Sequence, residues 1–287
     1  PISPRKTLTV AAALAGGLVG SVGLVFLFQL LDPRLRREEE LGERFRLPVL
    51  ARVPRADRRR RGRRTGPIVP DALSPEAADA YRTLRAALTA SKRRTGRGRV
   101  ILVTGSTPSE GKSTTAINLA AALAAFEERV MLIEGDLRRP SIGKALNIAT
   151  LEGVPSVLLE DVLFGQFKLA DALVDTVLAP NVESRRVRLL LANPDGVMPQ
   201  PLSPALLRSI LTAACSISDW VVIDGPPLLF EPDLLGVSEL IDDVILVARL
   251  GTTVVDNLGK TAEMLVQYGV RPAGFVVIGT TGRPEYY

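Results

Sequence analysis

The residues with the clearest chemical meaning form a short loop between an apolar run and an alanine-rich segment. Residues 105–115 read Gly-Ser-Thr-Pro-Ser-Glu-Gly-Lys-Ser-Thr-Thr, which fits the phosphate-loop pattern GxxxxGK[ST] except that Ser106 takes the place of the first glycine, with Gly105 beside it. Such a loop presents backbone N–H groups to phosphate oxygens, a lysine to the β and γ phosphates and a hydroxyl to Mg²⁺. We therefore predict that ATP or GTP is bound by Thr107, Pro108, Ser109, Glu110, Gly111, Lys112, Ser113 and Thr114.

Acidic residues follow two further apolar runs. Glu134 and Asp136 come after residues 130–133, and Asp224 comes directly after residues 220–223. Because parallel strands share a direction, these carboxylates are expected at the sheet edge that also carries the phosphate loop. There Asp136 and Asp224 can hold Mg²⁺ directly or through water. An Asp after a strand can instead cap the next helix, an alternative that weakens when two such acids accompany a phosphate loop.

Apolar runs and helical periodicities alternate along the rest of the chain. Strands are expected at residues 99–104, 129–133, 187–191, 220–223, 243–247 and 273–278, and helices at 74–90, 113–126, 203–215, 233–240 and 256–268. Residues 151–180 are expected to be helical with breaks. This alternation predicts an α/β fold, namely a P-loop NTPase-like parallel sheet with helices on both faces.

An apolar segment before this sheet predicts one transmembrane helix. Residues 8–31 carry no charge, and a helix of that length crosses a hydrocarbon core of about 30 Å. A secretory signal peptide would have a shorter apolar stretch and a small-residue cleavage site, which residues 32–37 do not supply. Residues 34–64 are rich in arginine, whereas only Arg5 and Lys6 precede the segment, so the rest of the chain is predicted to be cytoplasmic.

Residues 33–70 are predicted to be a basic juxtamembrane linker. They are rich in Arg, Pro and Gly and lack a clear period, apart from a short extended insert at residues 47–54. The arginines at 58–61, 63 and 64 are expected to contact anionic lipid headgroups or to be solvated. Nucleic acid is the less favoured partner, because no aromatic residue is interleaved with these arginines.

The cysteine and histidine content limits the chemistry that is available. The chain has one cysteine, Cys215, and no histidine. A disulfide framework and imidazole metal sites are therefore excluded. Acid and base catalysis must come from carboxylates, lysine or tyrosine.

Taken together, these motifs resemble the bacterial tyrosine kinases of the Wzc and CpsD polysaccharide co-polymerase family. Residues 105–113 match its Walker A loop, residues 130–139 its second acidic motif, Walker A′, and residues 220–227 its Walker B strand. Residues 1–4 resemble the proline motif before the family's second membrane helix. Residues 79–85 resemble its oligomerisation motif Glu-x-x-Arg-x-x-Arg, with Asp in place of Glu.

This resemblance covers nearly the whole chain and implies four parts. These are the end of the proline motif with the membrane helix (1–32), the basic linker (33–70), the P-loop tyrosine kinase domain (71–279) and a tyrosine-containing tail (280–287). The protein is then expected in the cell membrane, with its catalytic domain in the cytoplasm.

The resemblance also implies roles for the site residues, with ATP and Mg²⁺ as cofactors. Lys112 and the loop amides would bind the phosphates, Ser113 and Asp224 would hold Mg²⁺ with Asp136 as a further ligand, and Asp136, helped by Glu134, would orient or deprotonate a tyrosine hydroxyl. Walker A′ normally reads Asp-x-Asp, so Glu134 is one methylene longer than the family residue. In addition, Gly225 replaces the Ser or Thr that usually follows the Walker B aspartate.

The expected phosphate acceptors are Tyr286 and Tyr287, which follow a strand ending at the catalytic edge. The family's tail carries several tyrosines, whereas this one has two. The resemblance implies a homo-oligomer, expected as a ring, in which the tail enters a neighbouring subunit and Asp79, Arg82 and Arg85 lie at the interface. The polysaccharide polymerase and export machinery, membrane lipid and a tyrosine phosphatase are the other implied partners.

Two alternative functions are compatible with the same fold. One is a partitioning or positioning ATPase of the ParA and MinD type, but those proteins carry an additional lysine early in the loop, where this chain has Thr107. A fixed membrane helix also conflicts with their reversible recruitment to a surface. The other alternative is a catalytically weak scaffold that sets polysaccharide chain length through assembly alone.

Overall fold

The computed structural model describes residues 10, 14, 16–21, 23–24, 32–55, 70, 73–90, 96–126, 128–148, 157–178, 186–196 and 203–280. The chain divides into two units, Pro1–Arg34 and Leu35–Tyr287. Residues described in the first unit before position 25 are helical. Among the described residues, no helix has the length and apolarity needed to span a membrane. Most of the span predicted at residues 8–31 lies outside the described ranges, so it stays a prediction.

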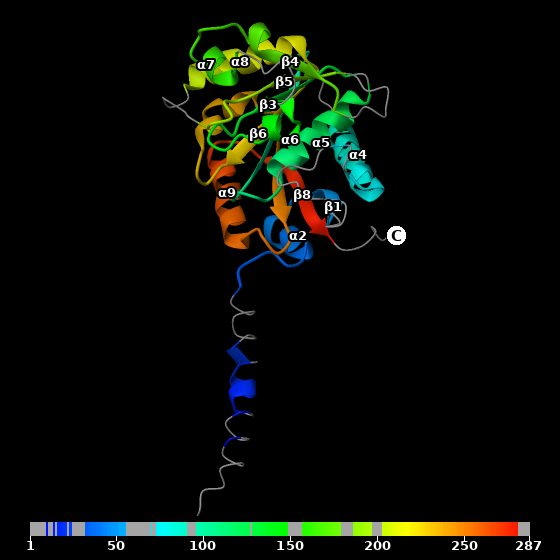
Figure 1. The fold of residues 1–287 in the computed structure, drawn as a ribbon, viewed down its shortest axis with the longest axis vertical. Coiled ribbons are helices and arrows are strands. Elements are labelled where there is room, and N and C mark those ends of the chain that lie inside the picture. The colour runs from blue at the N-terminus through cyan, green and yellow to red at the C-terminus, as the bar shows by residue number, and fades with distance from the viewer. Residues whose placement is uncertain are drawn as a thin grey trace, which may run out of the picture. The chain divides into compact units, whose positions relative to one another are not determined.

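The second unit is built on an eight-stranded sheet with the order β1-β8-β7-β2-β6-β3-β5-β4 (Figure 1). Neighbouring strands are parallel except for β4 and β5, which run antiparallel. The strands are β1 (Val49–Pro54), β2 (Arg99–Gly105), β3 (Val130–Glu134), β4 (Leu173–Thr176), β5 (Val187–Leu190), β6 (Trp220–Pro227), β7 (Asp243–Arg249) and β8 (Pro272–Thr280). The predicted α/β fold, a P-loop NTPase-like parallel sheet, is thereby confirmed, except that β4 runs antiparallel.

Helices cover both faces of the sheet (Figure 1). In the central strand β2, Ile101 and Val103 pack with α4 and α5, whereas Val100 and Leu102 pack with α8 and α9 on the opposite face. All four side chains are fully buried, as expected for a parallel strand whose side chains alternate between two covered faces. The helices are α2 (Glu39–Phe45), α4 (Pro75–Ala90), α5 (Lys112–Ala124), α6 (Ile142–Ala145), α7 (Leu159–Leu163), α8 (Pro204–Ile217) and α9 (Val255–Gln267).

Two regions differ from the sequence-based expectation. Residues 233–240 form a 3₁₀ helix, η4 (Asp233–Leu240), with a break at Val237. Within residues 151–180, the described part contains α7, a short 3₁₀ helix (Leu169–Ala172) and the antiparallel strand β4, which was not predicted. Its four residues pair with β5 only after the chain has turned back, a contact that local periodicity does not reveal.

Part of the predicted linker belongs to the folded unit instead. Residues 39–54 contain helix α2 and strand β1, and β1 extends the sheet by pairing parallel to β8. Ala51 and Val53 point into the core shared with α4, while Arg52 points outward and pairs with Glu38 at 2.8 Å. This alternation of buried and exposed residues is typical of an edge strand. The extended insert expected at residues 47–54 corresponds to β1, but the surrounding arginines indicate a linker and give no sign that this insert joins the sheet.

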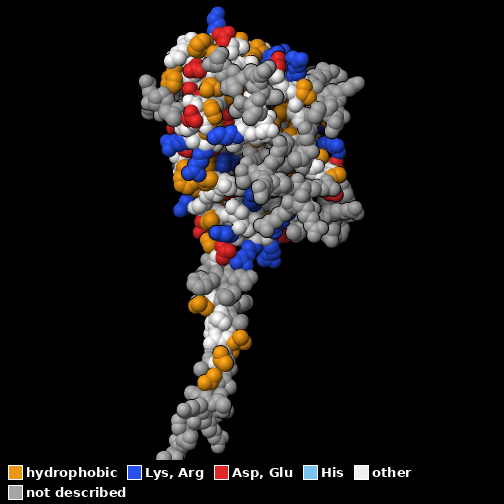
Figure 2. Space-filling view, viewed as in Figure 1, with side chains coloured by type: hydrophobic (Ala, Val, Ile, Leu, Met, Phe, Trp, Pro, Cys, Tyr) orange, Lys and Arg blue, Asp and Glu red, His pale blue; other side chains and the backbone are white. Residues whose placement is uncertain are grey.

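The surface of the folded unit mixes both signs of charge. Figure 2 shows Lys and Arg side chains interspersed with Asp and Glu on the face in view. Solvent-exposed ion pairs such as Arg44 with Asp256, at 2.7 Å, each contribute at most about 1 kcal/mol to the free energy of unfolding. The stability of the unit therefore comes mainly from the two apolar cores.

Replacing Val53 with Asp tests the place of β1 in the sheet. Val53 is 5% exposed, so a carboxylate there should lower the free energy of unfolding by about 3 kcal/mol or more. Its exposed neighbour provides the control, because Arg52→Gln should cost no more than about 1 kcal/mol. Chemical denaturation measures both variants, and equally small effects would contradict the assignment of β1 to the core.

Candidate functional site

The site forms where β2, β6 and β3 end side by side. Asp224 on β6 is in register with Val103 on β2 and with Glu134 on β3. The N–H of Gly135 also donates to the backbone oxygen of Asp224 at 2.9 Å, which joins the ends of β3 and β6. Parallel pairing thus brings the phosphate loop and both acidic segments to the carboxyl edge of the sheet, where α/β proteins bind their ligands.

The loop between β2 and α5 has the backbone shape of a phosphate cradle. Gly111 has a φ of 103°, and a Cβ at that position would lie 2.4 Å from Cδ1 of Ile278. Ser109 also adopts a positive φ, of 67°. Helix α5 begins immediately afterwards at Lys112, so its first N–H groups face the loop. The amino end of this helix can therefore bind phosphate oxygens.

The side chain of Lys112 is buried among carboxylates at this edge. Its Nζ donates a hydrogen bond to the carbonyl oxygen of Thr107 at 3.1 Å. Burial lowers the pKa of the ammonium, and the surrounding negative charges oppose this shift. These charges belong to Asp224, Glu110, Asp136 and Glu231, in decreasing order of effect. The structure therefore brings Lys112, Asp136 and Asp224 together.

Asp224 has the properties of a carboxylate that is ready to receive a cation. It is 1% exposed, and neither of its buried oxygens accepts a well-formed hydrogen bond. Burial raises its pKa to about 8, with a further increase from Glu134 and Asp136, while the Ser113 hydroxyl and Lys112 act in the opposite direction. Such an orphaned buried carboxylate beside a hydroxyl fits the ligands that Mg²⁺ prefers.

The residues at this edge suit a metal ion that is bound together with nucleotide phosphates. Within the part of the chain that the structure describes, no group of three or more His, Cys, Asp or Glu side chains is arranged to hold a metal by itself. Nucleotide-bound Mg²⁺ usually takes one or two protein carboxylates and completes its shell with phosphate oxygens and water. Asp224 and the hydroxyl of Ser113 supply protein ligands of this kind.

Glu134 and Asp136 have different environments although they are two residues apart. The carboxylate of Glu134 accepts hydrogen bonds from the N–H groups of Ser141 at 2.5 Å, Ile142 at 2.6 Å and Ala192 at 3.2 Å. Burial raises its pKa, and these amides counteract the rise. Asp136 is only half-buried, and it accepts one bond from the N–H of Arg139 at 2.9 Å. Asp136 is thus the more accessible of the two acids.

Two site residues were missed by the sequence analysis. The hydroxyl of Ser141 donates to Oγ of Ser113 at 2.9 Å, so it positions a predicted metal ligand. Glu231 follows β6 and interacts electrostatically with both Lys112 and Asp136. Burial is the main cause that raises its pKa, and the Asp136 charge adds to it. The only sequence feature that could have indicated Glu231 is its position four residues after the end of β6. No sequence feature indicated Ser141.

The predicted interface residues lie on helix α4, which packs against α5 and β1. Asp79 and Arg82 are exposed and form an ion pair one helical turn apart. The guanidinium of Arg85 lies 3.5 Å above the ring of Phe126, at the end of α5. Arg82 is therefore available to a partner, whereas Arg85 also contributes to packing within the subunit. Tyr286 and Tyr287 lie outside the described residues.

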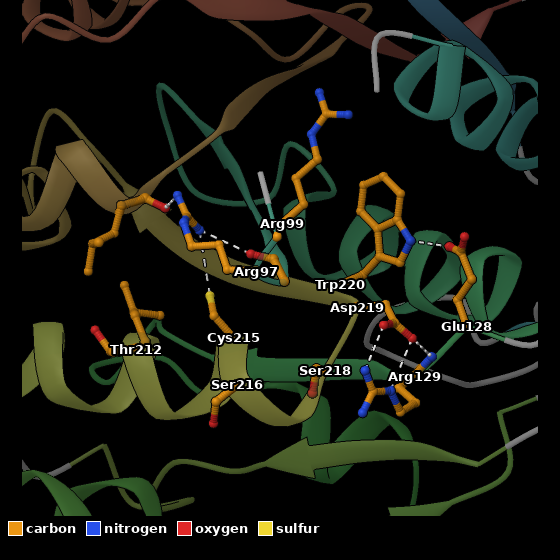
Figure 3. A pocket seen from close by; sticks show the side chains of 14 residues that line it. Arg97, Arg99, Glu128, Arg129, Thr212, Cys215, Ser216, Ser218, Asp219 and Trp220 are labelled. Carbon is orange, nitrogen blue, oxygen red and sulfur yellow. Dashed lines mark hydrogen bonds and ion pairs between the residues drawn. The ribbon is translucent and has the colours of Figure 1, made fainter. Parts of the chain in front are cut away.

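A hollow of about 850 Å³ lies at the opposite edge, where β2 and β6 begin (Figure 3). Its charged side chains largely pair with acids: Arg129 contacts Asp219 at 2.8 Å, and Arg97 contacts Asp242 at 3.0 Å. These pairs neutralise the arginines, so the hollow has little unbalanced charge to attract a polyphosphate. The nucleotide site is accordingly assigned to the loop edge.

Comparison with known proteins agrees with this geometry. Residues 101–284 match the CbiA family, described as the CobQ/CobB/MinD/ParA nucleotide binding domain. The chain belongs to this family of nucleotide-binding proteins.

Its relatives narrow the class further. The chain is 30% identical over 182 residues to the tyrosine-protein kinase YwqD of Bacillus subtilis, covering 62% of this chain and 71% of that protein. It is 27% identical over 285 residues to the tyrosine-protein kinase ptk of Acinetobacter johnsonii, covering 96% of this chain. The solved BceF tyrosine kinase domain superposes with a TM-score of 0.67 and 25% identity, covering 86% of this chain and all of that one. The predicted membership in the bacterial tyrosine kinase family is thereby confirmed.

The chain spans only part of some relatives, including 37% of the length of the Acinetobacter protein. The fold itself is shared more widely, since the cell division ATPase MinD of Pyrococcus furiosus superposes with a TM-score of 0.51.

Without nucleotide, the Asp224→Asn variant should have a higher free energy of unfolding than wild type, and this difference should grow as the pH rises. The folded protein retains the Asp224 proton up to about pH 8, whereas an unfolded chain releases it near the ordinary pKa of 3.8. Wild-type stability contributed by this group is therefore lost as the pH rises between these values. Asn has no proton to lose, so the variant should gain about 0.5–2 kcal/mol at pH 8.

Urea unfolding at several pH values between 5 and 8 measures this gain. Asp256→Asn is a suitable control, because that carboxylate is 66% exposed and its variant should show no growing difference. An Asp224→Asn difference that stays constant with pH would contradict the assigned burial.

Proposed function

We propose that this chain is the membrane-anchored catalytic segment of a bacterial tyrosine autokinase that uses Mg²⁺-ATP. The observation that supports it best is the meeting of a buried Lys112 with Asp136 and Asp224 on a phosphate loop. This arrangement occurs in a chain that is 30% identical to a protein named as a tyrosine-protein kinase. By the same resemblance, the kinase regulates the assembly or export of a capsular or extracellular polysaccharide.

Each residue in the site has a proposed role. Lys112 and the loop amides bind the phosphates, and Ser113, Asp224 and Asp136 hold the metal. Asp136 orients the incoming tyrosine hydroxyl or accepts its proton, since it is the more accessible acid. When bound, Mg²⁺ supplies positive charge that offsets the charge on the phosphate oxygens. Glu134 supports these groups by holding the segment that contains Ser141.

The position of the tyrosines supports the tail as phosphate acceptor. Only four are present in the chain. Tyr81 is 1% exposed, so it cannot reach a nucleotide without a rearrangement of α4. Its burial also raises the pKa of the phenol. Tyr268 lies between α9 and the start of β8, at the edge opposite the phosphate loop. The tail follows β8, which ends at Thr280 on the catalytic edge, and this favours Tyr286 and Tyr287.

We further propose the assembly in which this reaction occurs. Residues 1–32 would anchor the protein in the cell membrane, and the arginines at 58–61, 63 and 64 of the basic linker (33–70) would contact lipid. Residues 71–279 would act in the cytoplasm, together with α2 and β1, which pack in the same folded unit. Subunits would form a homo-oligomeric ring through Asp79, Arg82 and Arg85, so that each tail, residues 280–287, enters a neighbouring site. Export machinery and a tyrosine phosphatase complete the set of partners, and nucleic acid is not among them.

Lys112→Met and Asp136→Asn should each reduce tyrosine phosphorylation by about 100-fold or more, because positioning and charge neutralisation supply most of the rate of phosphoryl transfer. Incubation with Mg²⁺-ATP, followed by mass spectrometry, measures phosphotyrosine at each site. Circular dichroism checks that both variants are folded. Undiminished labelling would remove the proposed roles, and phosphate release without phosphotyrosine would favour an ATPase.

A mixing experiment tests the acceptor and the direction of transfer. One subunit carries Lys112→Met with an intact tail, and the other is active but carries Tyr286→Phe and Tyr287→Phe. Transfer between chains should label the tail of the inactive subunit to a level near that of wild type. Labelling that requires both features in one chain would show transfer within a subunit, and labelling elsewhere would exclude the tail.

A further inference from the structure

Glu110 is a buried acid in the phosphate loop for which the proposed mechanism has no use. It is 0% exposed, so its carboxylate is enclosed by the protein. Its carboxylate accepts bonds from the N–H groups of Ser106 at 2.8 Å and Thr107 at 3.0 Å. The hydroxyls of the same two residues donate to it at 2.7 Å and 3.0 Å. The Glu110 carboxylate thus accepts hydrogen bonds from both backbone and side-chain donors of Ser106 and Thr107, at the start of the loop.

The shifted glycine in the motif makes room for this carboxylate. A Cβ at Gly105 would lie 2.3 Å from Oε2 of Glu110 and 3.1 Å from the carbonyl oxygen of Val247. Ser106, which replaces the usual first glycine, offers both an N–H and an O–H to the same acid. The departure from GxxxxGK[ST] is therefore explained by the acid that it accommodates.

A second loop holds the other side of the Glu110 carboxylate. Thr253, between β7 and α9, donates its hydroxyl to Oε1 of Glu110 at 2.8 Å. Thr253 is itself fixed and fully buried, since its Oγ1 accepts from the N–H of Arg249 at 2.9 Å and its carbonyl oxygen accepts from the N–H of Leu35 at 2.7 Å. Glu110 thus ties the phosphate loop to a rigid neighbour through charge-assisted bonds.

We propose that Glu110 is a positioning residue that sets the shape of the phosphate loop, with Thr253 as its anchor. It does not touch the nucleotide. It fixes Thr107, whose carbonyl oxygen accepts the bond from the Lys112 ammonium, and it immediately precedes Gly111 with its φ of 103°. Weakening the contacts of Glu110 removes none of the phosphate-binding groups. It makes their binding geometry less well fixed in the nucleotide-free protein. The effect therefore falls on nucleotide affinity.

The inference rests on the proposed nucleotide binding, and a matched pair of Thr253 variants tests it. Thr253→Val keeps the shape of the side chain and removes the hydroxyl, whereas Thr253→Ser keeps the hydroxyl. Calorimetric titration of the full chain with Mg²⁺-ADP should give a Kd about tenfold higher for the Val variant, because a hydrogen bond to a charged group is lost. The Ser variant should stay within about twofold of wild type.

Kinetics separate positioning from a general loss of structure. The KM for ATP should rise in Thr253→Val by a similar factor, while kcat stays within about twofold, because the transferring groups are untouched. Glu110→Gln should raise Kd further, since its amide NH₂ faces donors. Thermal unfolding without nucleotide gives the stability of each variant.

Two results would overturn the inference in distinguishable ways. A Val variant with a lower melting temperature and unchanged Kd and KM would show that the contact stabilises the fold only. Failure of the wild-type protein to bind Mg²⁺-ADP would overturn the proposed function, and the inference with it.

Discussion

A buried ammonium surrounded by carboxylates is the interaction on which the catalytic edge depends. Lys112 is 7% exposed, and a charge removed from water to that extent needs compensation. Asp224, Glu110, Asp136 and Glu231 supply more negative charge than one lysine can balance. Burial is the main cause that raises the pKa of Asp224 to about 8, and the charges of Glu134 and Asp136 add to it. Mg²⁺ bound with a polyphosphate would bring positive charge to the carboxylates. Its phosphate oxygens would bring negative charge to the Lys112 ammonium.

The order of the strands is what allows these charges to meet. β6 is inserted between β2 and β3, although β2 and β3 follow one another in the chain. Asp224 therefore comes to lie between the phosphate loop and the segment that carries Glu134 and Asp136. With β6 outside this pair, Asp224 would lie one strand, about 4.8 Å, further from either the phosphate loop or the segment that carries Asp136. The buried pairings on both sides of β6 fix this order.

Much of this arrangement could be predicted because it depends on local patterns. Continuous β-branched runs indicated β2, β3, β6, β7 and β8 within a few residues, and the rule that parallel strands share a carboxyl edge placed Asp136 and Asp224 beside Lys112. Other features depend on partners far away in the chain. Thr253 and Glu110 are 143 residues apart, and Glu134 contacts Ala192, 58 residues away. No local period reports such contacts, and the same holds for β1, whose partner is β8.

Two of the departures from the kinase pattern, Glu134 and Gly225, fall where the residue takes part in contacts within the protein. The additional methylene of Glu134 extends its carboxylate to N–H groups on two separate segments, which are the start of α6 and the end of β5. At Gly225, a Cβ would lie 2.6 Å from Cδ1 of the fully buried Leu102 and 3.3 Å from the carbonyl oxygen of Val103, so a serine would require the end of the Leu102 side chain to move. Neither change removes a charge from the group around Lys112. The proposed chemistry therefore rests on Asp136 and Asp224, whereas Glu134 and Gly225 are used in packing and hydrogen bonding between the strands and loops around them.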